Sequence, residues 1–449
     1  LQPSIKNEGV AGVDMKSTDT VQKNQAAVGS MVQKGTAAEK LVFLENELVK
    51  ISLTNKGARP SEVELKNYKS ADSLPVKLIS SSFNKLSYLI NTNNNETASS
   101  DELYFDADEV IKESDGSSSV VFRLKDSSGK SIAHTFTLKP NAYVLEWKLQ
   151  VNGADKLFTH NNINLVWQVQ ADQHERDIQT EKRETQLGLL NEEGYDYFTM
   201  RDGLNKSWEA GLKWLSVKQK FFNTTLIADQ GFSHVDNMQV NLPATATADL
   251  KFSFFMGPND YQILRSQHIE LENIVNLGQG VYAFVKYINR WVVMPVFDFI
   301  QKYALNYGLA IALLTIFIRL LTSPLIYSSY VSGAKMKALR PELDAIKAKY
   351  EGDQQAFSME QMKLYRSAGV NPLGGCIPGL LQIPIFFALY AYFNANIELR
   401  GVSFWWSKDL SSFDAIVKWG FNIPGLGSHL SLFTILAVVT NLLIALYSM

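Results

Sequence analysis

Cysteine is almost absent from this 449-residue chain, since Cys376 is the only one, and an internal disulfide is therefore excluded. The six histidines lie far apart, and no Cys/His spacing suits a metal site. Neither a glycine-rich phosphate loop nor a nucleophile elbow is present. The formal net charge is −2 without a basic arm, which argues against a sequence-specific nucleic-acid partner. We therefore predict no metal, no cofactor and no enzymatic activity.

Acidic residues are missing from three long apolar runs that all lie in the last third of the chain. They cover residues 307–327, 372–397 and 430–449, and each is long enough to cross the ~30 Å hydrocarbon core of a bilayer as a helix. We predict three transmembrane helices. Pro324, Pro378 and Pro384 are expected to kink the first two, because proline removes a helical hydrogen bond.

The first part of the chain has a different pattern. Residues 1–40 are polar and without periodicity, which predicts a flexible linker. Residues 41–271 alternate between apolar and polar side chains in short runs, separated by Asn, Ser, Gly and Pro, and show no regular helix. This pattern predicts an antiparallel β-sandwich.

Three segments border the predicted spans. Residues 272–306 place aromatic and apolar side chains at helical spacing, which predicts an amphipathic helix in the membrane interface or, alternatively, one packed on the β-domain. Residues 328–371 predict a helical hairpin, and residues 398–429 form a loop that carries Trp405, Trp406 and Trp419. The cations of the hairpin are Lys335, Lys337, Arg340, Lys347, Lys349, Lys363 and Arg366.

These seven cations set the predicted orientation. The excess of Lys and Arg is typical of cytoplasmic loops, so the hairpin is assigned to the cytoplasm and the β-domain to the opposite side. Export of the β-domain then requires a segment before Leu1, and we expect further spans after Met449.

One charge, Arg319, interrupts the first apolar run. An arginine at the centre of a bilayer costs ~2.5 kcal/mol or several times that, depending on the method. Its side chain either snorkels to the cytoplasmic interface or faces a polar cavity. Thr315 shares its helical face, and Gln382 and Asn441 interrupt the other two runs, so we predict one polar groove lined by the four residues.

Several motifs in the last third resemble the YidC family of membrane protein insertases. They are TIFIRLLTSPL at Thr315–Leu325, KMKALRPEL at Lys335–Leu343, VNPLGGCIPGLLQIPIFFALY at Val370–Tyr390 and FWWSKDLS at Phe404–Ser411. The β-rich region that ends in Met256-Gly257-Pro258 resembles the large periplasmic domain of the Gram-negative branch.

The resemblance implies a fold and an activity. The chain would be a multidomain protein of the bacterial inner membrane, with a periplasmic β-sandwich, a helical transmembrane bundle and a cytoplasmic helical hairpin. Arg319 and Thr315 would line a hydrophilic groove that receives nascent membrane proteins, and the hairpin would recruit clients. The Sec translocon, the ribosome and the phospholipid bilayer are the implied partners. The family's first span and its last spans are expected to lie outside this sequence.

Two other functions compete with this interpretation. A carbohydrate- or peptide-binding β-sandwich would need a histidine and a carboxylate in one cleft, and His174 with Glu175 or Glu181 is the only such group. A channel or transporter is compatible with an intramembrane arginine and broken helices, but no internal repeat is detectable.

Overall fold

The computed structural model describes residues 38–93, 96–126, 128–159, 162–200, 207–208, 211–233, 239–241, 247–370, 377–423 and 427–448. Most of the predicted linker and the 371–376 segment therefore lie outside the described residues. The chain divides into two compact units at the Pro258–Asn259 bond.

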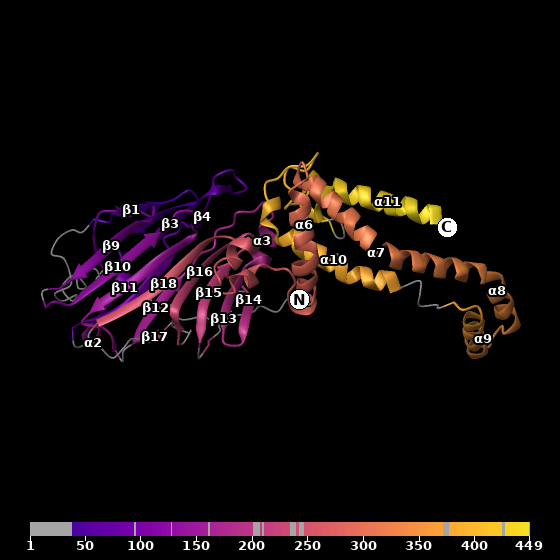
Figure 1. Ribbon diagram of the computed structural model, residues 1–449, viewed down its shortest axis with the longest axis horizontal. Coiled ribbons are helices and arrows are strands. Elements are labelled where there is room, and N and C mark those ends of the chain that lie inside the picture. The colour runs from indigo at the N-terminus through magenta and orange to yellow at the C-terminus, as the bar shows by residue number, and fades with distance from the viewer. Residues whose placement is uncertain are drawn as a thin grey trace, which may run out of the picture. The chain divides into compact units, whose positions relative to one another are not determined.

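The first unit is built on one long antiparallel sheet (Figure 1). Its strand order is β14-β13-β15-β16-β18-β11-β10-β9-β7, and β8 also pairs with β9. In chain order these strands are β7 (Asp106–Ala107), β8 (Ile111–Lys112), β9 (Ser118–Lys125), β10 (Ser131–Leu138), β11 (Val144–Asn152), β13 (Gln186–Asn191), β14 (Gly194–Thr199), β15 (Leu212–Lys218), β16 (Phe222–Phe232) and β18 (Thr247–Pro258).

Two four-stranded antiparallel sheets complete this unit, in the orders β1-β2-β3-β4 and β17-β12-β5-β6. The predicted antiparallel β-architecture is therefore confirmed. The strands are β1 (Leu41–Glu45), β2 (Val49–Thr54), β3 (Arg59–Lys69), β4 (Pro75–Ile79), β5 (Lys85–Asn93), β6 (Glu96–Ser99), β12 (Asn162–Gln168) and β17 (Gln239–Asn241). Short helices η2 (Ser100–Glu102), α2 (Ala154–Leu157) and α3 (Ile178–Glu184) lie between strands.

Strict alternation explains most of these strands. In β10 every second residue is buried, so one face of the strand points into the core. The alternation misleads at residues 215–222, where it continues as in a single strand. The chain turns there between β15 and β16, with the Gln219 amide bonded to the Phe222 carbonyl. This turn contains no Gly, Pro, Asn or Asp, so the sequence carries no turn signal.

A buried polar triad joins the sheets in the core. The Trp147 indole donates to His134 Nδ1 at 3.2 Å, and His134 Nε2 lies 2.7 Å from the Tyr88 hydroxyl. Because indole N–H only donates, Nδ1 accepts, and the histidine proton is on Nε2. Burial lowers the pKa of His134 from 6.5 to about 3, so the ring is neutral. Its contribution to stability is complete above pH 6.5 and is lost as the pH falls toward 3.

Replacing Tyr88 with Phe should destabilise the first unit. The substitution removes the hydroxyl that pairs with the buried His134 Nε2, and the loss of a buried hydrogen bond costs about 0.5–1.5 kcal/mol. Denaturant unfolding of the whole protein, followed by near-UV circular dichroism, measures the loss. Tyr104→Phe is the matched control, since Tyr104 is only partly buried. Equal loss in the two variants would contradict this role for the triad.

The second unit begins with short helical turns, and the helix predicted at 272–306 occupies only Val285–Gln301, where α5, η6 and α6 follow one another without a break. Gly278 and Gly280 adopt positive φ and interrupt the segment, and Pro295 lies in the first turn of α6. The elements are α4 (Tyr261–Arg265), η4 (Leu271–Ile274), η5 (Gly280–Tyr282), α5 (Val285–Ile288), the π-helical turn η6 (Asn289–Val293) and α6 (Met294–Gln301).

Long helices follow these turns (Figure 1). The first, α7 (Tyr307–Ala338), continues beyond residue 327, where we predicted its end. Among the described residues, only its Tyr307–Pro324 stretch is long and apolar enough to cross a membrane, and the apolar Leu432–Tyr447 stretch is shorter. The remaining elements are α8 (Arg340–Lys349), α9 (Gln354–Ser367), α10 (Ile377–Ala395), η8 (Ile397–Leu399), β19 (Ala415–Ile423), β20 (Gly427–Ser431) and α11 (Leu432–Ser448).

Candidate functional site

Helix α7 has one packed face and one open face. Ala310, Leu314, Ile318 and Thr322 are buried and recur every fourth residue, so they form a single stripe along the helix. Helices α6 and α10 both contact α7. Arg319 and Thr315 lie next to this stripe and are exposed. The helix therefore presents Arg319, the one charged side chain of its apolar Tyr307–Pro324 stretch, on a face that these contacts leave open.

Hydroxyl groups satisfy backbone carbonyls around Arg319. The Thr315 hydroxyl donates to the Ile311 carbonyl at 2.8 Å, and the Thr322 hydroxyl donates to the Ile318 carbonyl at 2.9 Å. Pro324 removes the hydrogen bond that the Leu320 carbonyl would accept, and the Ser323 hydroxyl donates to that carbonyl at 2.8 Å. This replacement bond allows α7 to continue through the proline as one helix.

The other predicted groove residues lie on separate helices. Gln382 is half-buried on α10, which contacts α7. Asn441 is exposed on α11, where its amide donates to the Ala437 carbonyl at 2.9 Å. Within the described residues, α11 packs on β20 and has no extensive contact with α7 or α10. The structure thus places Arg319 and Thr315 on one face and Asn441 on a helix that does not pack against it.

Two of the predicted kink positions lie in α10. Pro384 is inside the helix, as Pro324 is inside α7. Pro378 is the second residue of α10, and its side chain lies outside the described residues. Kinks at these three positions stay a prediction.

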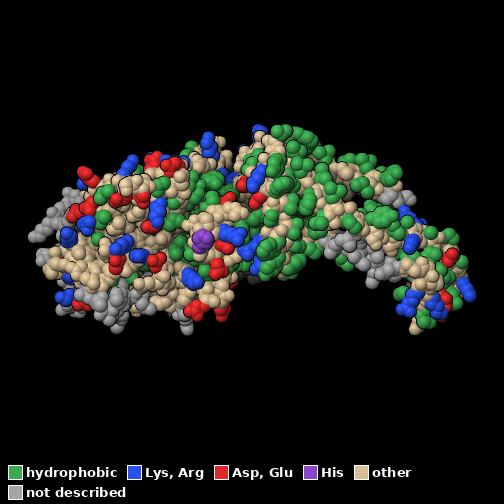
Figure 2. Space-filling model, in the orientation of Figure 1, with side chains coloured by type: hydrophobic (Ala, Val, Ile, Leu, Met, Phe, Trp, Pro, Cys, Tyr) green, Lys and Arg blue, Asp and Glu red, His purple; other side chains and the backbone are tan. Residues whose placement is uncertain are grey.

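The predicted hairpin range contains the end of α7, α8 and α9. All seven of its predicted cations are exposed, and blue side chains gather at α8 and α9 in Figure 2. Lys335 and Lys337 lie in the last turn of α7, where cations favour the helix dipole. Lys363 pairs with Glu360 at 2.6 Å, one helical turn away. The Asp353 carboxylate caps α9 by accepting from the amides of Gln355 and Ala356.

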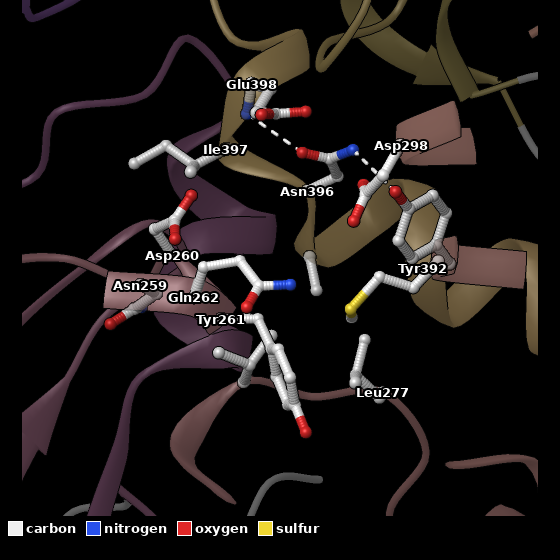
Figure 3. A pocket seen from close by; sticks show the side chains of 13 residues that line it. Asn259, Asp260, Tyr261, Gln262, Leu277, Asp298, Tyr392, Asn396, Ile397 and Glu398 are labelled. Atoms are coloured by element: carbon white, nitrogen blue, oxygen red, sulfur yellow. Dashed lines mark hydrogen bonds between the residues drawn. The ribbon is translucent and has the colours of Figure 1, made fainter. Parts of the chain in front are cut away.

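A pocket of about 420 Å³ lies within the second unit, and sequence reasoning missed it (Figure 3). Its acidic side chains come from three distant segments, which are Asp260 before α4, Asp298 of α6 and Glu398 of η8. Amide side chains and the phenols of Tyr261 and Tyr392 complete the polar lining, and apolar groups fill the rest. No local motif joins these segments, so only the fold reveals the pocket.

The three carboxylates repel one another in this pocket. Burial, together with the charges of Asp260 and Asp298, raises the pKa of Glu398 from the usual 4.5 to about 7. Burial and the Asp260 charge also raise the pKa of Asp298, and Lys302 opposes the shift. Asp260 caps α4 by accepting from the Ile263 amide at 2.9 Å. The pocket therefore changes charge close to neutral pH.

The histidine–carboxylate group of the competing sugar-binding hypothesis has a structural role. Glu181 is buried, and its carboxylate accepts hydrogen bonds from the backbone amides of His174 and Glu175 at 2.9–3.1 Å. Because its oxygens accept hydrogen bonds from backbone amides, the Glu181 carboxylate fixes the conformation of the loop at His174 and Glu175. It is therefore poorly placed to act as a general base on a ligand. These residues therefore give the sugar-binding hypothesis no support.

Comparison with known proteins decides the family. Residues 41–292 match the family model described as YidC periplasmic domain, and residues 299–449 match that of the 60Kd inner membrane protein. The chain is 33% identical over 442 residues to the membrane protein insertase YidC of Phocaeicola vulgatus, covering 92% of this chain and 70% of the relative. The corresponding protein of Parabacteroides distasonis is 32% identical over 462 residues, covering 95% and 72%.

The chain belongs to the YidC family of membrane protein insertases. A crystal structure of an active YidC insertase is also similar, at 20% identity and a TM-score of 0.33, covering 88% of this chain and 80% of that chain. Family membership places the chain in the bacterial inner membrane with its β-domain in the periplasm. The carboxylate pocket is lined by residues from the end of the segment that matches the periplasmic domain, Asp260 among them, and by residues at the end of α10 that continues into η8.

Replacing Glu398 with Gln should remove a pH dependence from the stability of the second unit. Since the folded pKa of about 7 exceeds the reference value of 4.5, the wild-type protein loses stability as the pH rises from 4.5 through 7. The Gln variant lacks this loss, so its advantage in melting temperature should be greatest above pH 7. Thermal unfolding in lipid nanodiscs over this range measures it.

Glu351→Gln, at an exposed position of the hairpin, is the control and should keep the wild-type slope. A Glu398→Gln profile parallel to that of the wild-type protein would show that Glu398 does not titrate in the pocket.

Proposed function

We propose that this chain inserts client proteins into the membrane by holding a client's polar tail at Arg319 while the client's apolar segment enters lipid beside α7 and α10. The observation that carries this proposal is the environment of Arg319. Helices α7, α10 and α11 contain no Asp or Glu, and among the described residues no carboxylate lies within ion-pair distance of the Arg319 guanidinium. Its counter-charge therefore has to come from water, from a span outside this sequence or from a client.

An acidic client tail fits this environment. Arginine offers five N–H donors in a planar fork, which matches a carboxylate in bidentate geometry. The attraction is strong where water is scarce, because the effective dielectric constant is low. Thr315 shares the exposed face one turn earlier. The two side chains would hold a polar segment at membrane depth without closing a cavity around it.

The energy for transfer would come from the client and the membrane. Burying an apolar segment of about twenty residues in lipid is favourable, and the membrane potential adds ~2.3 kcal/mol per charge per 100 mV for a tail of the right sign. Neither contribution requires nucleotide hydrolysis. The mechanism agrees with the lack of a phosphate-binding motif in the sequence.

The competing explanation for Arg319 is snorkelling, in which the guanidinium only reaches the cytoplasmic interface. The two explanations differ in their dependence on the client. A snorkelling arginine stabilises α7 for every client alike, whereas a receptor for acidic tails discriminates by tail charge. A charge-exchange experiment separates them.

Replacing Arg319 with Glu should slow insertion of a client with an acidic periplasmic tail by about tenfold to a hundredfold. This factor corresponds to the loss of one charge-assisted hydrogen bond, which contributes ~1.5–3 kcal/mol. The same variant should insert a client whose tail acids are changed to Lys better than it inserts the original client. Protease protection of radiolabelled client in proteoliposomes measures the rate.

Arg319→Lys keeps the charge and should retain part of the activity, and Lys112→Glu, at an exposed position of the β-domain, is the control for a charge reversal outside the groove. If both clients slow equally in the Arg319→Glu variant, the client-binding role is wrong and snorkelling is the better explanation.

The hairpin supports a second part of the proposal, that its cations recruit ribosomes and, with the Sec translocon, newly made clients on the cytoplasmic side. Lys347 and Lys349 lie close together at the end of α8 and are exposed. Contacts of such cations with RNA phosphates are independent of sequence and weaken as salt displaces them. This agrees with the predicted lack of a sequence-specific nucleic-acid site.

Replacing both Lys347 and Lys349 with Gln should weaken ribosome binding to proteoliposomes. The slope of log affinity against log salt should become shallower by roughly 0.7–0.9 for each cation that contacts a phosphate. Co-sedimentation across a salt series measures both quantities. Lys112→Gln with Lys125→Gln, on the periplasmic domain, is the control pair and should change neither. An unchanged slope in the hairpin variant would contradict ribosome recruitment by these lysines.

A further inference from the structure

A ladder of aromatic rings lies in the segment that joins η8 to α11, here called the outer loop (residues 400–431). The ring centroids of Phe404 and Trp405 are 5.0 Å apart, those of Trp405 and Trp406 5.5 Å, and those of Trp406 and Phe433 4.8 Å. Phe433 is the second residue of α11. The ladder therefore ends on the first turn of an apolar helix.

The other end of the ladder rests on the first turn of α7. A Cβ added to Gly308, the second residue of α7, would lie 2.2 Å from ring carbons of Phe404. Only glycine allows this approach. Since α7 and α11 both belong to the inner-membrane part of the family, the ladder runs along the level at which two helices leave the bilayer on the periplasmic side.

The loop backbone holds Trp405 in an unfavourable conformation that exposes it. Its φ is +51°, in the left-handed region that non-glycine residues avoid, and its side chain is 78% exposed. The amides and carbonyls of Phe404 and Ser407 bond to each other at 2.9 Å in both directions and fix this turn. Strain of this kind persists only where the surrounding structure enforces it, and it often marks a functional position.

The charges of the outer loop favour an anionic partner. The Asp409 carboxylate accepts from the amides of Gly401 and Ser411, and the Asp414 carboxylate accepts from the Trp406 indole and the Phe433 amide. These hydrogen bonds occupy both acids inside the loop. Lys408 and Lys418 are exposed, so the loop presents indole surface and positive charge together.

We propose that the outer loop is a lipid-binding surface, in which Trp405 enters the headgroup region of the periplasmic leaflet and Lys408 contacts lipid phosphate. Tryptophan favours this region because its ring is apolar and its N–H finds hydrogen-bond acceptors there. The bilayer is the occupant that the fold itself places beside the ladder, because the ladder touches α7 and α11 where they begin. Trp406 is the inner member, held by Asp414, and Trp405 is the ring that meets lipid.

Electron paramagnetic resonance on the full chain tests this surface. A spin label is attached after Trp405→Cys in a Cys376→Ala background, and the protein is placed in vesicles of phosphatidylcholine and phosphatidylglycerol. The ratio of collisions with oxygen to collisions with a water-soluble nickel complex should be severalfold higher than for a label at Glu109→Cys, an exposed position of the β-domain. Equal ratios at the two positions would overturn the proposal.

Dipolar broadening of the label at position 405 would show a second copy of the chain at this surface, and it would also overturn the proposal. Quenching by brominated lipid provides an independent measurement without a label. Fluorescence of the wild-type protein should be quenched by a larger fraction than that of Trp405→Phe, and equal fractions would count against lipid contact. Neither readout depends on insertion activity.

Discussion

The cost of a guanidinium in hydrocarbon is the constraint on which the membrane part of this protein depends. Arg319 follows directly after a buried residue of the α7 stripe, so α7 cannot rotate to hide the charge without exposing Ala310, Leu314 and Ile318. Packing against α6 and α10 therefore fixes the direction in which Arg319 points. The exposure of Arg319 is therefore a consequence of apolar packing on the opposite side of the helix.

Backbone polarity imposes a related constraint at Pro324. A carbonyl without a partner at membrane depth costs several kcal/mol, since no water is available to satisfy it. The Ser323 hydroxyl supplies that partner for the Leu320 carbonyl, and Thr315 and Thr322 donate to carbonyls one turn back. Hydroxyl side chains around Arg319 thus donate hydrogen bonds to backbone carbonyls of α7. The TSP sequence at Thr322–Pro324 is explained by backbone chemistry before any contact with a client is considered.

The sequence predicted those features that depend on local pattern, and it failed where distant segments meet. Alternation identified strands such as β4 and β10, and the lone Arg319 identified the open face of α7. The turn at Gln219 lacks any turn residue, and the positive φ of Gly278 interrupts the segment that we expected to be one helix. The carboxylate pocket depends on the meeting of Asp260, Asp298 and Glu398, which no local pattern encodes.

The two ends of the membrane helices differ in the charged side chains that they carry. At the α8–α9 end, seven exposed cations face solvent and are separated by few acids. At the η8 end, carboxylates gather in a pocket where burial keeps Glu398 partly protonated near neutral pH, which limits the negative charge beside the bilayer. A protonated carboxyl is cheaper to keep near lipid than a carboxylate. The η8 end can therefore hold acidic residues, and the α8–α9 end keeps a positive excess of the kind that is typical of cytoplasmic loops.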